Sequence, residues 1–229
     1  MKTAIIVFPG TNRESDMAMA FERLTGTAPA LIWHKDTDIG SPDLIVLPGG
    51  FSYGDYLRCG AMAAHSPVMK QVIAKARKGT RVLGVCNGFQ MLVETGLLPG
   101  ALLRNKTLKF ICKRVHIRCE SAGNAFTATM KKGDILHVPV AHGEGNYFAS
   151  PDILKDLEDH DRIAFRYCDK AGSITEAANC NGSIRNIAGV TNKEKTILGM
   201  MPHPEDATQD WQGNLTGLKI FESLTGASC

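Results

Sequence analysis

The first half of the chain alternates short apolar runs with longer stretches in which apolar residues recur at helical spacing. The apolar runs, at residues 4–8, 30–34, 44–47 and 81–85, predict buried strands. Helical spacing predicts helices at residues 12–24, 56–64, 68–77 and 88–94, the first capped by Asn12 and ended by Gly26. Strands that alternate with helices predict an α/β fold, a flavodoxin-like, doubly wound and mostly parallel sheet.

The second half of the chain has a different pattern, with strand-like runs and few helices between them. Strands are predicted at residues 102–104, 110–119, 125–129, 135–140, 162–167, 184–190 and 196–200. Helices are predicted only at 153–158 and 214–224. This half therefore adds antiparallel strands on or beside the parallel sheet. Because no repeat or linker interrupts the chain, we expect a single domain over residues 1–229.

Composition narrows the class of protein. A hydrophobic content of 44% and a charged content of 21% suit an ordinary packed core, and a net charge of +3 is too small to indicate nucleic-acid binding. No apolar run approaches the roughly 18 residues of a membrane span. The seven cysteines are odd in number and include no C-x-x-C pair, which disfavours disulfide and zinc frameworks. We therefore expect a cytoplasmic protein without a metal site.

The strongest chemical signal lies where the fourth predicted strand meets its helix. Cys86 stands at this junction, with Gly84 and Gly88 on either side. Glycines allow the strained turn that lifts a nucleophile clear of a sheet, and the positive end of the following helix favours the thiolate form of cysteine. Buried cysteines more often serve as small apolar side chains, but this setting favours a catalytic nucleophile.

A second segment supplies the partners that such a thiol requires. His203 lies between two prolines and is the candidate general base, since histidine exchanges protons near neutral pH. Glu205, two residues later, would project to the same side of an extended segment and orient the imidazole. Asp206 is a rival for this role. Separately, each residue fits an ordinary loop; together with Cys86 they predict a catalytic triad.

Backbone N–H groups near the nucleophile are candidates for an oxyanion hole. Gly49 and Gly50 follow the third predicted strand, which should lie beside the strand that carries Cys86. Their N–H groups, with that of Asn87, could stabilise a tetrahedral oxyanion. Glycines after a strand are also common in simple turns.

Further polar residues are candidates for substrate binding. Gln90 lies one helical turn beyond Cys86, and His142, Gly143 and Glu144 form a glycine-rich loop after a predicted strand. An ordinary solvent-exposed loop is the alternative interpretation of residues 142–144. A basic cluster on one ribbon suits a solvated strand edge better than a docking face; it comprises Lys106, Lys109, Lys113, Arg114 and Arg118.

Several of these segments resemble a known family. GVCNGFQ at residues 84–90 and PHPE at 202–205 are similar to the triad motifs of class I glutamine amidotransferases. VFPGTN at 7–12, GGFSYGD at 49–55 and AHGEG at 141–145 resemble more closely the glutaminase subunits of phosphoribosylformylglycinamidine synthase, of purine biosynthesis. The resemblance extends over most of the chain.

The resemblance implies that Cys86, His203 and Glu205 hydrolyse L-glutamine to glutamate and ammonia through a γ-glutamyl thioester. It also implies partners: a large synthetase subunit that receives ammonia through a channel, and a small third subunit. ATP and magnesium would be used by the synthetase, and this chain needs no cofactor of its own. The phosphate-binding pattern G-x-x-x-x-G-K-[ST] does not occur in the sequence.

Two alternatives remain open on the sequence. A cysteine peptidase-like hydrolase could use the same sheet, although such enzymes usually place the histidine soon after the elbow, where this chain has Asn87. The second alternative is a non-catalytic regulatory subunit, and the presence of Cys86, His203 and Glu205 argues against it. A transferase with another amide donor is a less favoured third.

Overall fold

The computed structural model describes residues 1–227, so Cys229 lies outside the described residues. Within residues 1–227 one mixed sheet has nine strands, in the order β2 (Ala30–Trp33), β1 (Thr3–Val7), β3 (Leu44–Leu47), β4 (Arg81–Val85), β11 (Ile197–Met200), β10 (Ile187–Thr191), β9 (Ile163–Cys168), β6 (Ile111–Cys119) and β7 (Ile135–His142). The strands from β2 to β11 run parallel, and each later pair is antiparallel. The predicted fold class is therefore confirmed.

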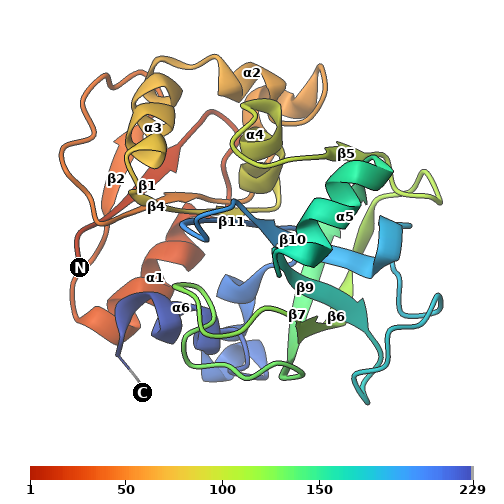
Figure 1. Ribbon diagram of the computed structural model, residues 1–229. Helices are drawn as coiled ribbons and strands as arrows, with labels where there is room; N and C mark the ends of the chain where they lie inside the picture. The colour runs from red at the N-terminus through yellow and green to blue at the C-terminus, as the bar shows by residue number, and fades with distance from the viewer. Residues whose placement is uncertain (228–229) are drawn as a thin grey trace.

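Helices cover both faces of the parallel half (Figure 1). On one face lie α1 (Glu14–Thr25) and α6 (Leu218–Thr225), joined by an edge-to-face contact between Phe21 and Phe221 at 5.1 Å between ring centroids. On the other lie α3 (Pro67–Arg77) and α4 (Asn87–Glu94), with the short α2 (Ala61–Ala64) beside α4. All four residues of β3 are buried, as expected for a strand covered on both faces.

The remaining elements are α5, a two-stranded ribbon and several short 3-10 helices. α5 (Pro151–Asp159) precedes β9 along the chain. A separate antiparallel pair is formed by β5 (Ala101–Leu103) and β8 (Asn146–Phe148), of which β8 was not predicted from the sequence. Short 3-10 helices lie at Ser52–Asp55, Ile184–Asn186, Pro204–Ala207 and Asp210–Gln212. In the described part of the chain, no helix has the length and apolar character needed to cross a membrane.

Two predicted elements are wrong because side chains and left-handed residues redirect the backbone. The helix predicted at 56–64 is restricted to α2, since Gly60 before it is left-handed at φ 80°. The strand predicted at 125–129 is a series of turns. There, the Asn124 side chain accepts from Phe126 N–H and the Thr127 hydroxyl donates to the Ser121 carbonyl, so local hydrogen bonds replace strand pairing.

Other predicted boundaries shift as well. The strand predicted at 184–190 begins only at Ile187, because Arg185 and Asn186 are left-handed. The helix predicted from residue 214 begins at Leu218. Asn12 does not cap α1: the residue at the cap position is Arg13, and it makes no side-chain capping bond. Asn12 instead donates its backbone N–H to the Gly49 carbonyl at 3.2 Å.

The basic cluster lies only partly on a strand edge. β6 pairs with β7 along most of its length but with β9 only from His116 to Cys119, so Lys113 and Arg114 lie on a stretch with no strand on the β9 side, whereas Arg118 lies in the part paired on both sides. Lys106 and Lys109 precede β6. Several of the cations have partners: Arg118 contacts Glu120 at 2.7 Å, Lys106 lies 3.5 Å from Glu176, and Arg114 donates to the Gln212 carbonyl.

Candidate active site

Cys86 stands on a sharp turn between β4 and α4. Its backbone angles are φ 50° and ψ −106°, a conformation that costs energy for a residue with a side chain. The turn is held because Cys86 N–H donates to the Met200 carbonyl of β11 at 2.8 Å. The flanking glycines are needed for packing: a Cβ at Gly88 would lie 1.9 Å from the Leu47 carbonyl oxygen, and one at Gly84 2.5 Å from Leu92. The predicted nucleophile elbow is present.

His203 is brought to this turn by the sheet topology. β11 lies directly beside β4, with Met200 paired to Val85, and the chain then continues through Pro202 to His203. The backbone N–H of His203 donates to the Pro139 carbonyl of β7 at 2.8 Å. The imidazole is 3% exposed, and its Nε2 is buried without a hydrogen-bond partner.

Glu205 completes the arrangement. Its Oε1 lies 2.7 Å from His203 Nδ1, and the carboxylate is fully buried. Burial by itself lowers the pKa of His203, but the charges of Glu205 and Cys86 together raise that pKa well above its usual value. The sequence prediction relied on an extended segment; in fact Glu205 lies in the 3-10 turn Pro204–Ala207. Asp206 is not the partner, since it pairs with Arg13 at 3.3 Å.

The three candidate oxyanion residues have different surroundings. Gly50 lines the pocket that contains Cys86. Gly49 lies against the His203 ring, where an added Cβ would be 2.7 Å from Cε1. Asn87 is the first residue of α4, whose first N–H groups have no partner within the helix. The Asn87 side chain, which accepts from Ser52 N–H at 3.2 Å, ties the 49–52 turn to the elbow.

A cavity of about 270 Å³ lies beside Cys86, and all four candidate substrate-binding residues line it: Gln90, His142, Gly143 and Glu144. The Gln90 side-chain amide already has two hydrogen-bond partners within the protein. Its Oε1 accepts from Asn87 Nδ2 at 2.9 Å, and its Nε2 donates to the Glu144 carbonyl at 2.7 Å. Gln90 thus ties the 142–145 loop to α4.

His142 is a neutral, deeply buried member of this cavity wall. Its Nδ1 lies 3.0 Å from Asn105 Oδ1, and its Nε2 is buried without a hydrogen-bond partner. Burial, reinforced by the nearby charge of His203, lowers the pKa of His142 to about 4. With Nδ1–H donated to Asn105, Nε2 is an acceptor at neutral pH.

Several residues that line the cavity were not selected from the sequence. They are Phe51, Asp55, Cys59, Arg104, Leu108, Phe110 and Ala141. Phe51 and Asp55 belong to the GGFSYGD motif and Ala141 to the AHGEG motif, which were recognised without a role being given to these residues. The other four come from turns and loops with no sequence pattern that marks a site.

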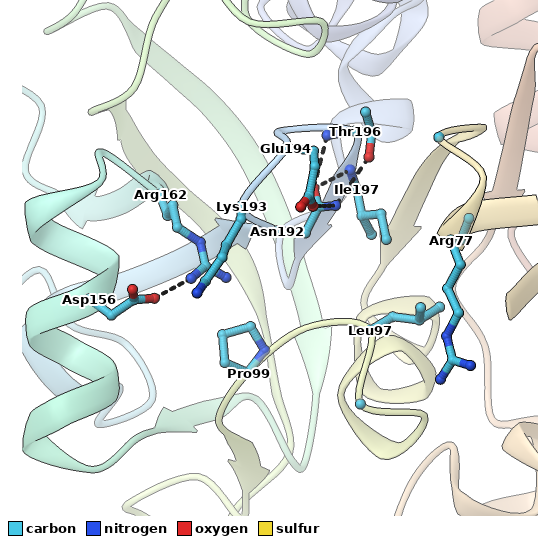
Figure 2. Close-up of a pocket in the computed structure, with 13 residues that line it drawn as sticks. Arg77, Leu97, Pro99, Asp156, Arg162, Asn192, Lys193, Glu194, Thr196 and Ile197 are labelled. Carbon is cyan, nitrogen blue, oxygen red and sulfur yellow. Dashed lines mark hydrogen bonds and ion pairs between the residues drawn. The ribbon is translucent and has the colours of Figure 1, made fainter.

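A larger cavity, of about 590 Å³, lies elsewhere (Figure 2). Its lining includes Gly79, Thr196 and Ile197, at the amino ends of β4 and β11, whereas Cys86 follows the carboxyl end of β4. Figure 2 shows Arg162 paired with Asp156 on one wall of this cavity. In parallel sheets, active sites form beyond the carboxyl ends of strands, so the smaller cavity is the candidate site.

Comparisons with known proteins agree with this geometry. Residues 1–223 match the family model described as a CobB/CobQ-like glutamine amidotransferase domain. Proteins named phosphoribosylformylglycinamidine synthase subunit PurQ, from Bradyrhizobium diazoefficiens and Rhodospirillum rubrum, are each 52% identical over 225 residues, or 98% of this chain, and 97% and 98% of the relatives. The chain belongs to the PurQ family of glutamine amidotransferases. The resemblance inferred from the motifs is confirmed, and with it the enzyme class.

A solved structure extends the comparison to three dimensions. A chain in the structure of PurLQS from Thermotoga maritima superposes with a TM-score of 0.86 at 38% identity, covering 98% of this chain and 97% of that one. The PurQ family fold therefore includes both the parallel half and the antiparallel additions of this sheet.

Proposed function

We propose that this chain is the glutaminase subunit of a phosphoribosylformylglycinamidine synthase, with Cys86, His203 and Glu205 as its catalytic residues. The observation that carries the assignment of residues is the contact of Glu205 with His203, 2.7 Å long and fully buried, beside the strained Cys86 turn. A buried carboxylate on an imidazole next to a thiol is the arrangement that activates a nucleophile.

The geometry supports a two-step reaction. His203 takes the thiol proton as Cys86 Sγ attacks the side-chain amide carbon of glutamine, and N–H groups of Gly50 and Asn87 hold the oxyanion. His203 gives this proton to the amide nitrogen, the C–N bond breaks and ammonia leaves, which gives a γ-glutamyl thioester. His203 then takes a proton from water as the water attacks the thioester, and it returns this proton to the sulfur as the C–S bond breaks, so that glutamate and the free thiol are released. Glu205 keeps the imidazole in one orientation and stabilises its charged form.

We infer that ammonia passes to a partner synthetase that uses ATP and magnesium to convert formylglycinamide ribonucleotide to its amidine. The similar Thermotoga maritima chain comes from a structure named PurLQS, and this name supports an assembly with partner subunits. Coupling has a chemical reason, because ammonia released into water at neutral pH is mostly protonated and is no longer a nucleophile.

The test replaces Cys86 with serine in the reconstituted complex. We expect amidine synthesis from glutamine to fall by about 10³-fold or more, while synthesis from added ammonium salts continues unchanged. Cys112→Ser is the matched control, because Cys112 is exposed on β6 and should affect neither reaction. Substantial glutamine-driven synthesis by Cys86→Ser would contradict the nucleophile assignment.

A further inference from the structure

The segment that carries Asp55 has an unusual backbone. Tyr53, Gly54 and Asp55 all adopt left-handed angles, with φ of 55°, 74° and 53°. Such a conformation is unfavourable for residues with side chains, and it persists only where the surroundings hold it. The Tyr53 hydroxyl is held by His34 Nδ1 at 2.7 Å and Ser66 Oγ at 2.8 Å. This anchoring fixes where the Asp55 carboxylate lies.

Asp55 lines the cavity that contains Cys86, and one of its oxygens lacks a donor. Oδ1 is inaccessible to solvent and has no hydrogen-bond partner, although a carboxylate oxygen normally accepts hydrogen bonds. The orphan nitrogen of His142 lines the same cavity. Two unpartnered polar groups in one small pocket indicate a ligand that supplies hydrogen-bond donors.

The charges around the pocket identify the sign of that ligand group. Glu144 lies near Asp55, and it receives the Cys59 N–H at 3.5 Å and the Arg104 guanidinium at 3.7 Å. Asp55 and Glu144 are thus two neighbouring carboxylates, and the Arg104 guanidinium contacts Glu144. Burial raises the pKa of Asp55, contact with the Cys59 thiol opposes the rise, and the charge of Glu144 adds to it. A cationic group beside Asp55 would offset both its burial and its repulsion by Glu144.

An organic ammonium fits the pocket better than a metal ion. Within residues 1–227, no group of three or more His, Cys, Asp or Glu side chains is arranged to hold a metal. A substrate that places an amide at Cys86 and an ammonium group a few bonds away satisfies both Asp55 and the nucleophile.

We propose that Asp55 accepts hydrogen bonds from the α-ammonium group of the substrate, and so makes the enzyme select a free α-amino acid over an amide that lacks this group. The inference rests on the proposed glutaminase function. A hydrogen bond from the α-ammonium group to Asp55 discriminates strongly between amides with and without this group, because an amide that lacks it leaves the buried Asp55 oxygen without a donor. Tyr53 is a positioning residue, which acts by holding Asp55.

The experiment compares two amides in the complex with the synthetase: L-glutamine, and 4-carbamoylbutanoate, which lacks the α-amino group. We expect wild-type kcat/KM to be at least 100-fold higher for glutamine. Asp55→Asn should lower kcat/KM for glutamine by about 10- to 150-fold, as for loss of a charged hydrogen bond, and leave that for 4-carbamoylbutanoate within about threefold. Asp152→Asn, an exposed carboxylate on α5, is the control.

Labelling separates this inference from the proposed function. Iodoacetamide, which has no ammonium group, should modify Cys86 equally fast in wild type and Asp55→Asn, which also shows that the elbow is folded. A diazoketone analogue of glutamine should label the variant at least 10-fold more slowly. If wild type does not cleave glutamine, the proposed function fails. If it cleaves glutamine but Asp55→Asn keeps the wild-type preference, or if wild type itself does not discriminate, only the role of Asp55 fails.

Discussion

Replacing Glu205 with glutamine removes one negative charge from beneath His203 and leaves the size of the side chain almost unchanged. Glu205 is fully buried, and its Oε1 contacts His203 Nδ1 at 2.7 Å. This carboxylate is a main cause of the raised pKa of His203. The substitution therefore tests whether the buried charge, rather than the packing, makes the imidazole an effective base.

The expected loss has two sources. A hydrogen bond to a charged group contributes about 1.5–3 kcal/mol, so loss of the charge alone reduces kcat by about 10- to 150-fold. The glutamine amide can also present its NH₂ group to Nδ1, which moves the imidazole proton to Nε2, the position that must accept the thiol proton. By comparison with the aspartate of serine protease triads, this wrong tautomer extends the loss to about 10⁴-fold.

The assay is glutamine-dependent amidine synthesis by the complex, run beside synthesis from ammonium salts. We expect Glu205→Gln to affect only the first reaction and to melt within a few degrees of wild type, since a neutral amide is less costly to bury than a carboxylate. Glu176→Gln is the control, because the Glu176 side chain is 93% exposed. Glutamine-driven rates within threefold of wild type would refute the role of the buried charge.

Two further substitutions test the surroundings of the triad. Gly49→Ala should lower glutaminase activity by about a hundredfold with little change in ammonium-dependent synthesis, because the new Cβ would lie 2.7 Å from His203 Cε1 and displace the ring; an unaltered rate would contradict this packing argument. His142→Asn should remove part of the acid sensitivity of folding. In wild type, His142 takes up a proton near pH 6.5 when unfolded but only near pH 4 when folded, so stability falls by about 3 kcal/mol as pH drops through this window. Urea unfolding measures the free energy of unfolding of both proteins at pH 7 and pH 4.5. An equal loss of this free energy between the two pH values in variant and wild type would exclude the contribution of His142.

The outcome at Cys86 shows what local sequence predicts well. An apolar strand, a cysteine between two glycines and an amphipathic helix follow each other within one short segment, so the elbow depends on neighbours in the chain. The wrong predictions have local causes too, but of a kind that periodicity does not detect. At 125–129 and at 53–60, side-chain hydrogen bonds and left-handed residues override an apparently regular pattern.

Residue type and spacing alone determined the α/β class, the position of the candidate nucleophile and the identity of its candidate partners. Strand and helix periodicities and a glycine-flanked turn are local properties of short stretches of chain. Only the tertiary structure placed β11 beside β4, which brings His203 to Cys86 across more than a hundred residues. It also selected Glu205 over Asp206 and directed Asp55 into the pocket. These outcomes depend on sheet order and on turns fixed by distant contacts, such as Tyr53 with His34 and Ser66.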